Sequence, residues 1–148
     1  MTRRPQLELG DYLPYLINRV GSALVASFSR DELVRQHLNI AEWRVLAALS
    51  NDGGQRQIDL AATISIDAST LSRLVTRLIR MGLVTRSRST TSSREVLVAL
   101  SPKGRKLVKR LIPVAKRLEQ AATAGLPAQD LAVVKRALRR MYRNMAGG

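Results

Sequence analysis

The pattern of apolar and polar positions predicts a helix over residues 67–82 with two different faces. An apolar stripe at i, i+3, i+4 and i+7 indicates burial along one side. It consists of Leu71, Leu74, Val75 and Leu78. Asp67 is placed to cap this helix and Gly82 to end it. The opposite face carries only hydroxyls and arginines, at Ser69, Ser72, Arg73, Thr76 and Arg80.

Two interpretations of that polar face are open from the helix alone. Hydroxyls and guanidinium groups donate hydrogen bonds to phosphate oxygens and base edges, and Arg pairs with guanine in two places at once. The same pattern also fits an ordinary amphipathic helix with a solvated basic face. The neighbouring segments have to decide between them.

The preceding segments predict the rest of a helix-turn-helix. Asn39 and Glu42 fit a capping box that begins a helix. Trp43 follows on its apolar face, where a core anchor is favoured over a ligand-stacking role. A short helix over residues 57–63 and a tight turn over 64–66 then lead into the helix at 67–82. A short helix, a turn and a polar-faced second helix are the parts of that motif.

The segment after the helix predicts a β-hairpin. Residues 85–88 and 94–100 read as short strands around the polar loop 89–93. Arg86, Arg88 and Arg94 flank the loop. A flexible surface turn is the plain alternative, but a basic wing beside a recognition helix is favoured. The predicted fold class is therefore mainly α, with a small hairpin wing on a helix-turn-helix lobe.

Long helices are predicted on both sides of this lobe. The first runs over residues 12–35, capped by Asp11, with Pro14 in its first turn. Ser101 and Pro102 begin another helix, in which Pro113 is expected to bend or loosen one turn. The last helix has apolar residues at spacings of 3 and 4, at Leu131, Val134, Leu138, Met141 and Met145. Such a seam needs a helix opposite; an intramolecular partner is possible, but a second subunit is favoured.

Composition limits the functional classes. The 148 residues suit one domain with appended helices, and 45% hydrophobic residues suffice for a core. With no Cys and one His, cysteine-ligated zinc, disulfides and histidine-rich metal sites are excluded, and no cofactor or metal is expected. The carboxylates form no evident pair, so an enzyme is not favoured. No apolar run reaches the ~18 residues of a membrane span and no signal peptide is evident, so we expect a soluble cytoplasmic protein.

The distribution of charge indicates a polyanionic partner. Net charge is +14, and residues 69–117 hold thirteen Lys/Arg against one acid, Glu95. A membrane surface would favour a basic helix backed by exposed aromatics, and RNA recognition usually uses aromatic stacking. The only Trp and Phe lie outside the basic segment. Double-stranded DNA is the favoured partner; a non-specific basic or architectural nucleic-acid-binding protein without an effector is the alternative.

The order of these elements resembles the MarR family of transcription regulators. The resemblance covers nearly the whole chain and is carried by the segments 38–46, 60–61, 69–78, 81–84 and 96–104. It implies a homodimer that binds a pseudo-palindromic operator, usually as a repressor released by a small aromatic or anionic effector. It also implies one domain over 1–148, with dimerisation helices in 1–36 and 102–148 and a winged helix-turn-helix lobe in 37–101.

The site residues follow from the pattern and the resemblance together. The expected DNA contacts are Arg56, Gln57, Ser69, Thr70, Ser72, Arg73, Thr76, Arg77, Arg86, Arg88 and Arg94. Expected effector contacts are Tyr12, Tyr15 and Trp43, and the expected dimer contacts add Leu13, Leu16 and Ile17 to the seam of the last helix. The wing departs from the family pattern, because Ser92 stands where the family has an Asp that orients the wing Arg. This leaves open whether the wing reads the minor groove.

Overall fold

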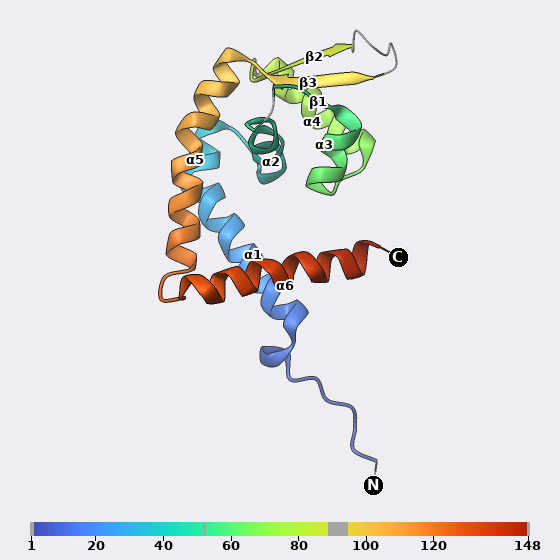
Figure 1. Ribbon diagram of the computed structural model, residues 1–148, viewed down its shortest axis with the longest axis vertical. Helices are drawn as coiled ribbons and strands as arrows, with labels where there is room; N and C mark the ends of the chain where they lie inside the picture. Colours follow the sequence, from blue (N-terminus) through green and yellow to red (C-terminus); the bar gives the residue numbers. More distant parts are fainter. Residues whose placement is uncertain (1, 52, 89–94, 148) are drawn as a thin grey trace. The chain divides into compact units, whose positions relative to one another are not determined.

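The computed structural model describes residues 2–51, 53–88 and 95–147, a mainly helical chain with one small antiparallel sheet (Figure 1). This confirms the predicted fold class. The helices are α1 (Leu13–Phe28), α2 (Ile40–Leu49), α3 (Gln57–Ile64), α4 (Ala68–Arg80), α5 (Pro102–Ala122) and α6 (Ala128–Ala146). The strands are β1 (Gln55–Arg56), β2 (Val84–Arg88) and β3 (Val96–Leu100). The chain divides into two compact units, residues 1–115 and 116–148.

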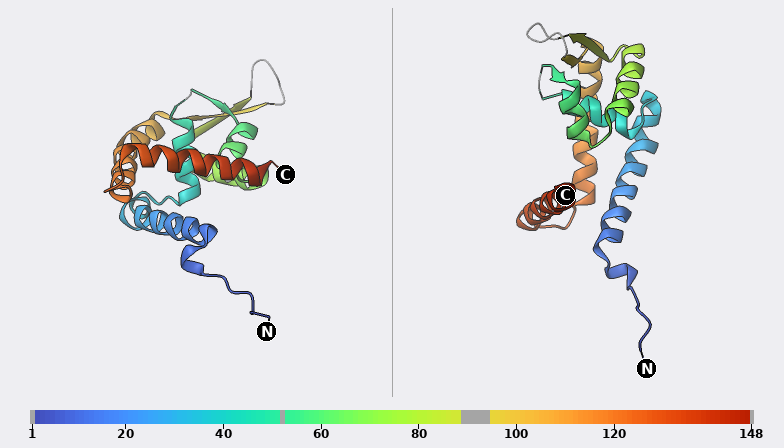
Figure 2. Two further views of the ribbon diagram at one scale, coloured as in Figure 1. Left: turned by 60° about the horizontal axis from the view of Figure 1, so that its bottom comes forward. Right: turned by 90° about the vertical axis from the view of Figure 1, so that its right-hand side faces the viewer.

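The first unit contains the winged helix-turn-helix lobe. Helices α2, α3 and α4 contact one another, α2 and α3 also contact β3, and α4 contacts β2 (Figures 1 and 2). The predicted apolar stripe of α4 supplies this core, since Leu71, Val75 and Leu78 are fully buried. Burial of these side chains is the main favourable contribution to the folding of the lobe.

The hairpin forms as predicted, but the sheet has a third strand. The strand order is β1-β3-β2, all antiparallel, with Val84 opposite Leu100 and Arg88 opposite Val96. Strand β1 was not predicted; it has two residues, Gln55 and Arg56, which pair with Val98 and Leu97. Two residues are too few for a hydrophobic period to be visible in the sequence.

The predicted capping box of α2 and the predicted glycine stop of α4 are confirmed. The Asn39 side chain accepts from the Glu42 backbone N–H at 2.8 Å, and Glu42 accepts from the Asn39 N–H at 2.9 Å. These bonds satisfy amide groups that the first turn of a helix leaves free. At the C-terminal end of α4, Gly82 has φ of +75°, a left-handed conformation that ends the helix at small steric cost.

The long helix predicted over residues 12–35 is helical over that length, but its geometry and its cap differ from the prediction. Regular α-helix ends at Phe28, and a π-helical turn, Ser29–Leu33, and a 3-10 turn, Val34–Gln36, follow. Phe28 and Leu33 are both buried; residues five apart diverge around an α-helix, and the wider turn brings them to one side. Asp11 does not cap α1 because it lies in a short 3-10 turn, and the N-cap position is Tyr12.

Helix α5 begins in direct contact with the end of α4. Ser101 caps α5, accepting from the Gly104 N–H at 3.0 Å, and donates its hydroxyl to the Gly82 carbonyl at 2.6 Å. A Cβ added at Gly104 would overlap the Leu83 carbonyl, so this approach of backbone to backbone requires glycine. A bend or a loosened turn was expected at Pro113; helix α5 is continuous through this residue, so the turn is not loosened.

The second unit contains the end of α5 and all of α6. Gly125, with φ of +85°, makes the turn between them, and Lys135 pairs with Glu119 at 3.3 Å. The predicted apolar seam of α6 is largely uncovered: Val134, Leu138 and Met145 are exposed. Among the described residues, no helix is long and apolar enough to cross a membrane.

Candidate DNA-binding surface

The N-terminal turn of α4 is ordered by one carboxylate. Asp67 accepts hydrogen bonds from the Thr70 hydroxyl at 2.6 Å, the Thr70 backbone N–H at 2.8 Å and the Ser69 hydroxyl at 2.7 Å. These donors, the Thr70 hydroxyl first, hold the pKa of Asp67 well below its usual range. Ser69 and Thr70, both predicted DNA contacts, therefore have fixed hydroxyl orientations at the start of the helix.

The predicted face of α4 is exposed. Ser69, Arg73 and Thr76 are exposed, and Ser72 is half-buried. Thr76 donates its hydroxyl to the Ser72 carbonyl at 2.9 Å, while Arg73 reaches back toward the Thr70 hydroxyl at 3.4 Å. The neighbours of Arg73 on this face, Ser69, Ser72 and Thr76, all have short side chains.

The wing is attached to this helix by Arg86. From β2, its guanidinium donates to the Ser72 carbonyl at 3.1 Å and lies 3.5 Å from the Thr76 hydroxyl. Arg86 thus joins wing and helix as well as being a predicted phosphate contact. Arg88 is exposed at the end of β2. The predicted wing contact Arg94, together with Ser92, lies outside the described residues.

Arg56 at the start of α3 is paired with acids, which the sequence did not predict. It makes two hydrogen bonds to Asp59, at 2.8 and 3.0 Å, and one to Glu95 at 3.1 Å. The hydrogen bonds to Asp59 raise the pKa of Arg56, and the one to Glu95 adds to the effect. Two carboxylates neutralise this guanidinium, which weakens its case as a phosphate contact. Gln57 beside it is half-buried.

Arg77 makes contacts inside the lobe. One guanidinium nitrogen pairs with the Glu42 carboxylate and another donates to the His37 carbonyl at 2.9 Å. Glu42 is fully buried, whereas 44% of the Arg77 side chain remains exposed. The sequence showed Glu42 only as a capping residue. In the sequence, Glu42 lies next to Trp43, a predicted core residue. This position was the one sign that Glu42 would be buried and that its charge would need a cation nearby.

The expected effector residues separate in the structure. Trp43 is buried, and its ring packs edge to face against that of Phe28, with 5.4 Å between the ring centroids. This confirms its interpretation as a core anchor. Tyr12 is exposed and Tyr15 half-buried on α1. Because Trp43 is buried, little of its ring is open to a stacking ligand, so only the two tyrosines stay as candidates. Among the described residues, no cluster of acids and histidine could hold a metal ion.

Comparison with known proteins identifies similar transcription regulators over most of the chain. A model described as MarR family matches residues 38–96, from just before α2 to the first residue of β3. The chain is 30% identical to an HTH-type transcriptional repressor of Mycobacterium tuberculosis, over 87% of this chain and 92% of the relative.

Two solved structures are similar in fold as well as sequence. BpsR of Bordetella bronchiseptica, whose DNA binding is regulated by 6-hydroxynicotinic acid, has a TM-score of 0.82 and 28% identity, covering 93% of this chain and 97% of that one. PcaV of Streptomyces coelicolor, a transcriptional regulator solved with its natural ligand, has a TM-score of 0.81 and 26% identity, covering 93% and 96%.

Proposed function

The chain belongs to the MarR family of transcriptional regulators, and from this premise we propose that it is a dimeric repressor that binds a pseudo-palindromic operator. Members of this family bind DNA, act as dimers and bind small-molecule ligands. The operator, the dimer surface and the effector of this chain are the parts that we propose.

One observation carries the proposal for DNA: the exposed face of α4 combines Arg73 with short hydroxyl side chains and no acid. An arginine on a groove-facing helix donates two hydrogen bonds to guanine O6 and N7, and short neighbours allow the close approach that this needs. We assign Arg73 to a base contact, Arg86 and Arg88 to phosphate or sugar, and Arg77 to support of the lobe. A purely non-specific basic protein would not need this ordered face.

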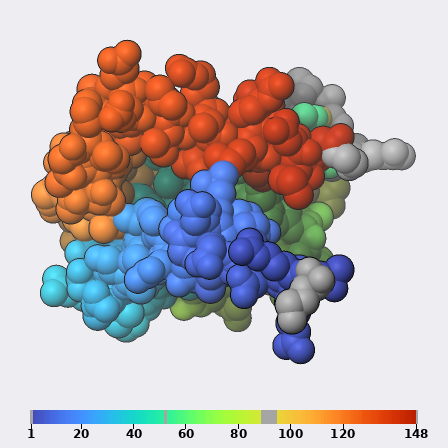
Figure 3. All heavy atoms as spheres, turned by 90° about the horizontal axis from the view of Figure 1, so that it is seen from below, coloured from blue at the N-terminus to red at the C-terminus, as the bar shows by residue number. Residues whose placement is uncertain are grey.

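The exposed apolar residues of α1 and α6 support the proposed dimer. On α1 they are Leu13, Leu16, Ile17 and Val20, and on α6 they are Val133, Val134, Leu138 and Met145. Figure 3 shows exposed side chains of α1 in blue and of α6 in red. Exposed apolar patches on a single chain typically mark surfaces that another protein covers. Two-fold symmetry would then place two copies of α4 on two half-sites.

Selection of bound sequences from a random pool of DNA duplexes tests this function. We expect an inverted repeat whose half-sites are separated by about one helical turn, 10–10.5 base pairs. The matched control is the Arg73→Ala variant taken through the same selection. Recovery of no shared sequence by the unmodified protein would favour the non-specific alternative and refute the proposal.

A further inference from the structure

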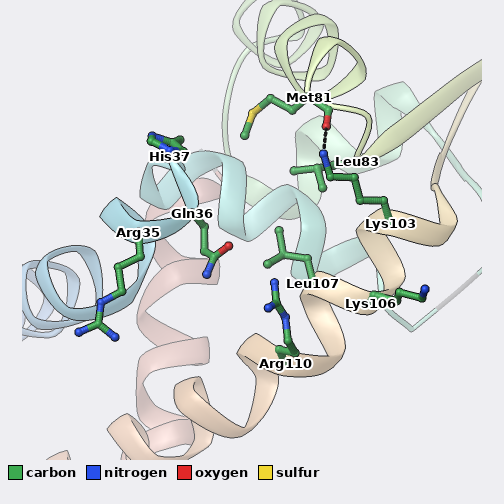
Figure 4. A pocket seen from close by; sticks show the side chains of 9 residues that line it. All are labelled: Arg35, Gln36, His37, Met81, Leu83, Lys103, Lys106, Leu107 and Arg110. Atoms are coloured by element: carbon green, nitrogen blue, oxygen red, sulfur yellow. Dashed lines mark hydrogen bonds between the residues drawn. The ribbon is translucent and has the colours of Figure 1, made fainter.

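The two ends of α4 differ in charge. Basic side chains of α5 lie around its C-terminal end, where Lys103 donates from Nζ to the Met81 carbonyl at 3.0 Å (Figure 4). At its N-terminal end, Asp67 is the capping residue, and the neighbouring Arg56 is paired with two carboxylates. The N-terminal end is the part that enters a major groove in helix-turn-helix docking, so its contacts there depend on groups other than cations.

A hollow of about 420 Å³ lies at this N-terminal end of α4. It is lined by the start of α3, the first residue of α4 and the start of β3. The lining residues are Arg56, Gln57, Ile58, Ala68, Glu95 and Val96. Ile58 is the second residue of α3 and is 70% exposed, and Ala68 is exposed as well. The hollow therefore presents two apolar groups beside the start of the recognition helix.

Polar groups at this end of α4 are engaged within the protein. Ser69 and Thr70 donate their hydroxyls to Asp67, at 2.7 and 2.6 Å, and the Arg56 guanidinium donates to its two carboxylates. A base edge that reaches this end therefore meets acceptor oxygens and apolar carbon. An A·T pair matches both, because adenine N6 donates a hydrogen bond and the C5-methyl of thymine is the apolar group of the major groove.

We propose that Ile58, together with Ala68, contacts the C5-methyl group of one thymine in each half-site and gives the protein a preference for thymine there. This contact rests on the proposed function and adds a residue of α3 to the base contacts of α4. Ile58 was not among the predicted DNA contacts. An isoleucine in a short helix has the same appearance in a sequence as a core residue, and only its exposure distinguishes it.

The experiment replaces each thymine of the selected operator, one at a time, by uracil, which lacks only this methyl group. The unmodified full chain is titrated against each duplex. We expect one position in each half-site at which uracil weakens binding about fourfold, the value of one buried methyl group. Ile58→Ala should remove most of this sensitivity, because two changes to the same contact are not additive.

The matched control is Ile79→Ala, since Ile79 is an exposed isoleucine of α4 outside the lining of the hollow. It should leave the sensitivity to uracil unchanged. Cytosine and 5-methylcytosine at the same position form a second pair that differs by the same methyl group. The unmodified protein should bind the methylated duplex more tightly, and Ile58→Ala should bind both alike. Because Ile58 is largely exposed and uncharged, its replacement should preserve the thermal unfolding and the salt slope.

Uracil without effect at every position would refute the methyl contact. Equal weakening of thymine and uracil duplexes by Ile58→Ala would place the side chain against the sugar–phosphate backbone, and sensitivity that persists in this variant would assign the methyl group to another residue; either result overturns the proposal. An inverted repeat with no such thymine leaves the proposed function intact. Failure of that function is recognised separately, because selection then yields no operator, and the thymine contact is refuted with it.

Discussion

Several hydroxyl groups on α4 use their protons in hydrogen bonds within the protein. Ser69 and Thr70 donate to Asp67, and Thr76 donates to the Ser72 carbonyl. With their protons engaged, these oxygens are left as acceptors, which in the proposed complex would suit the amino groups of adenine and cytosine. Under the proposed assignment, Arg73 is the main donor to base edges on this face, and a preference for guanine would depend on it.

Replacing Arg73 with Ala should remove a base contact. We expect a loss of about 1–3 kcal/mol on the selected operator and relaxed preference at one position in each half-site. Arg88→Ala is the matched variant: it should weaken all duplexes alike and make the salt slope shallower by about one unit. Titration of both variants against the operator and a scrambled duplex separates the two roles. If Arg73→Ala lowers the affinity for both duplexes equally, Arg73 contacts phosphate rather than a base, and the proposed base contact is refuted.

The Asp67 cap should make stability depend on pH in the acidic range. The folded pKa of Asp67 lies below the unfolded value of about 3.9, so its contribution is complete above that value and is lost as pH falls toward the folded pKa. Asp67→Asn should lower the melting temperature at pH 7 and reduce the acid-side decline. Thermal unfolding at a series of pH values measures this, and identical pH profiles for both proteins would contradict it.

At the level of elements, the pairing of Glu42 with Arg77 joins α2 to α4. Glu42 also caps α2 through the Asn39 N–H, so one buried carboxylate holds a helix start and the recognition helix together. A buried charge without a partner is strongly unfavourable. The pair therefore constrains where α4 lies relative to the rest of the lobe.

Arg77→Met should destabilise the lobe by about 2–3 kcal/mol, less than for a fully buried pair because Arg77 is partly exposed. Adding Glu42→Gln should recover part of that loss, since a neutral amide needs no counter-charge while it still accepts from the Asn39 N–H. Denaturant unfolding of both single variants and the double variant gives the coupling. Additive losses would show that the two side chains act independently.

The elements that the sequence predicted are those whose signals are local. A stripe such as Leu71 to Leu78, a capping box at Asn39 and a helix stop at Gly82 each lie within a few residues. The π-helical turn after Phe28 depends on Phe28 and Leu33 both entering the core, which no local period reveals. Strand β1 exists because β3 lies beside it. Both require the tertiary structure.

The same limit applies to the candidate surface. The face of α4 was predicted, since hydroxyl and arginine positions follow the helical period. The ion pairs of Arg56 with Glu95 and of Arg77 with Glu42 were not predicted, because the partners are 39 and 35 residues apart. A charge in a sequence shows only that a partner is needed, and three-dimensional packing decides which partner is found.

For the whole molecule, the concentration of charge predicts steep salt dependence. Thirteen Lys/Arg against one acid in residues 69–117 give several possible phosphate contacts. The logarithm of affinity should fall with the logarithm of salt concentration, with a slope of about −0.9 for each phosphate contacted. Titration of the operator at a series of salt concentrations measures the slope. A flat response would exclude counterion release as the source of affinity.

Dimerisation should depend on the exposed seam of α6. Leu138→Asp places a charge on a surface that a partner would bury, and we expect monomers or unfolded chain at micromolar concentration. Ala132→Asp, an exposed position off the seam, should leave the mass of the assembly unchanged. Light scattering after size-exclusion chromatography measures that mass. A monomeric mass for the unmodified protein under these conditions would refute the dimer.

The contact of Gly104 with the Leu83 carbonyl constrains the length of the connection between β3 and α5, as well as the residue type at position 104. One residue inserted or deleted between Leu100 and Gly104 would turn α5 by about 100° around its axis, since each helical residue advances by that angle. A neighbour with a side chain, Lys103 or Arg105, would then meet the carbonyl. The cationic side chains of α5 would point elsewhere. This short connection therefore fixes the register of α5, and tolerance to insertion and deletion should be lowest here.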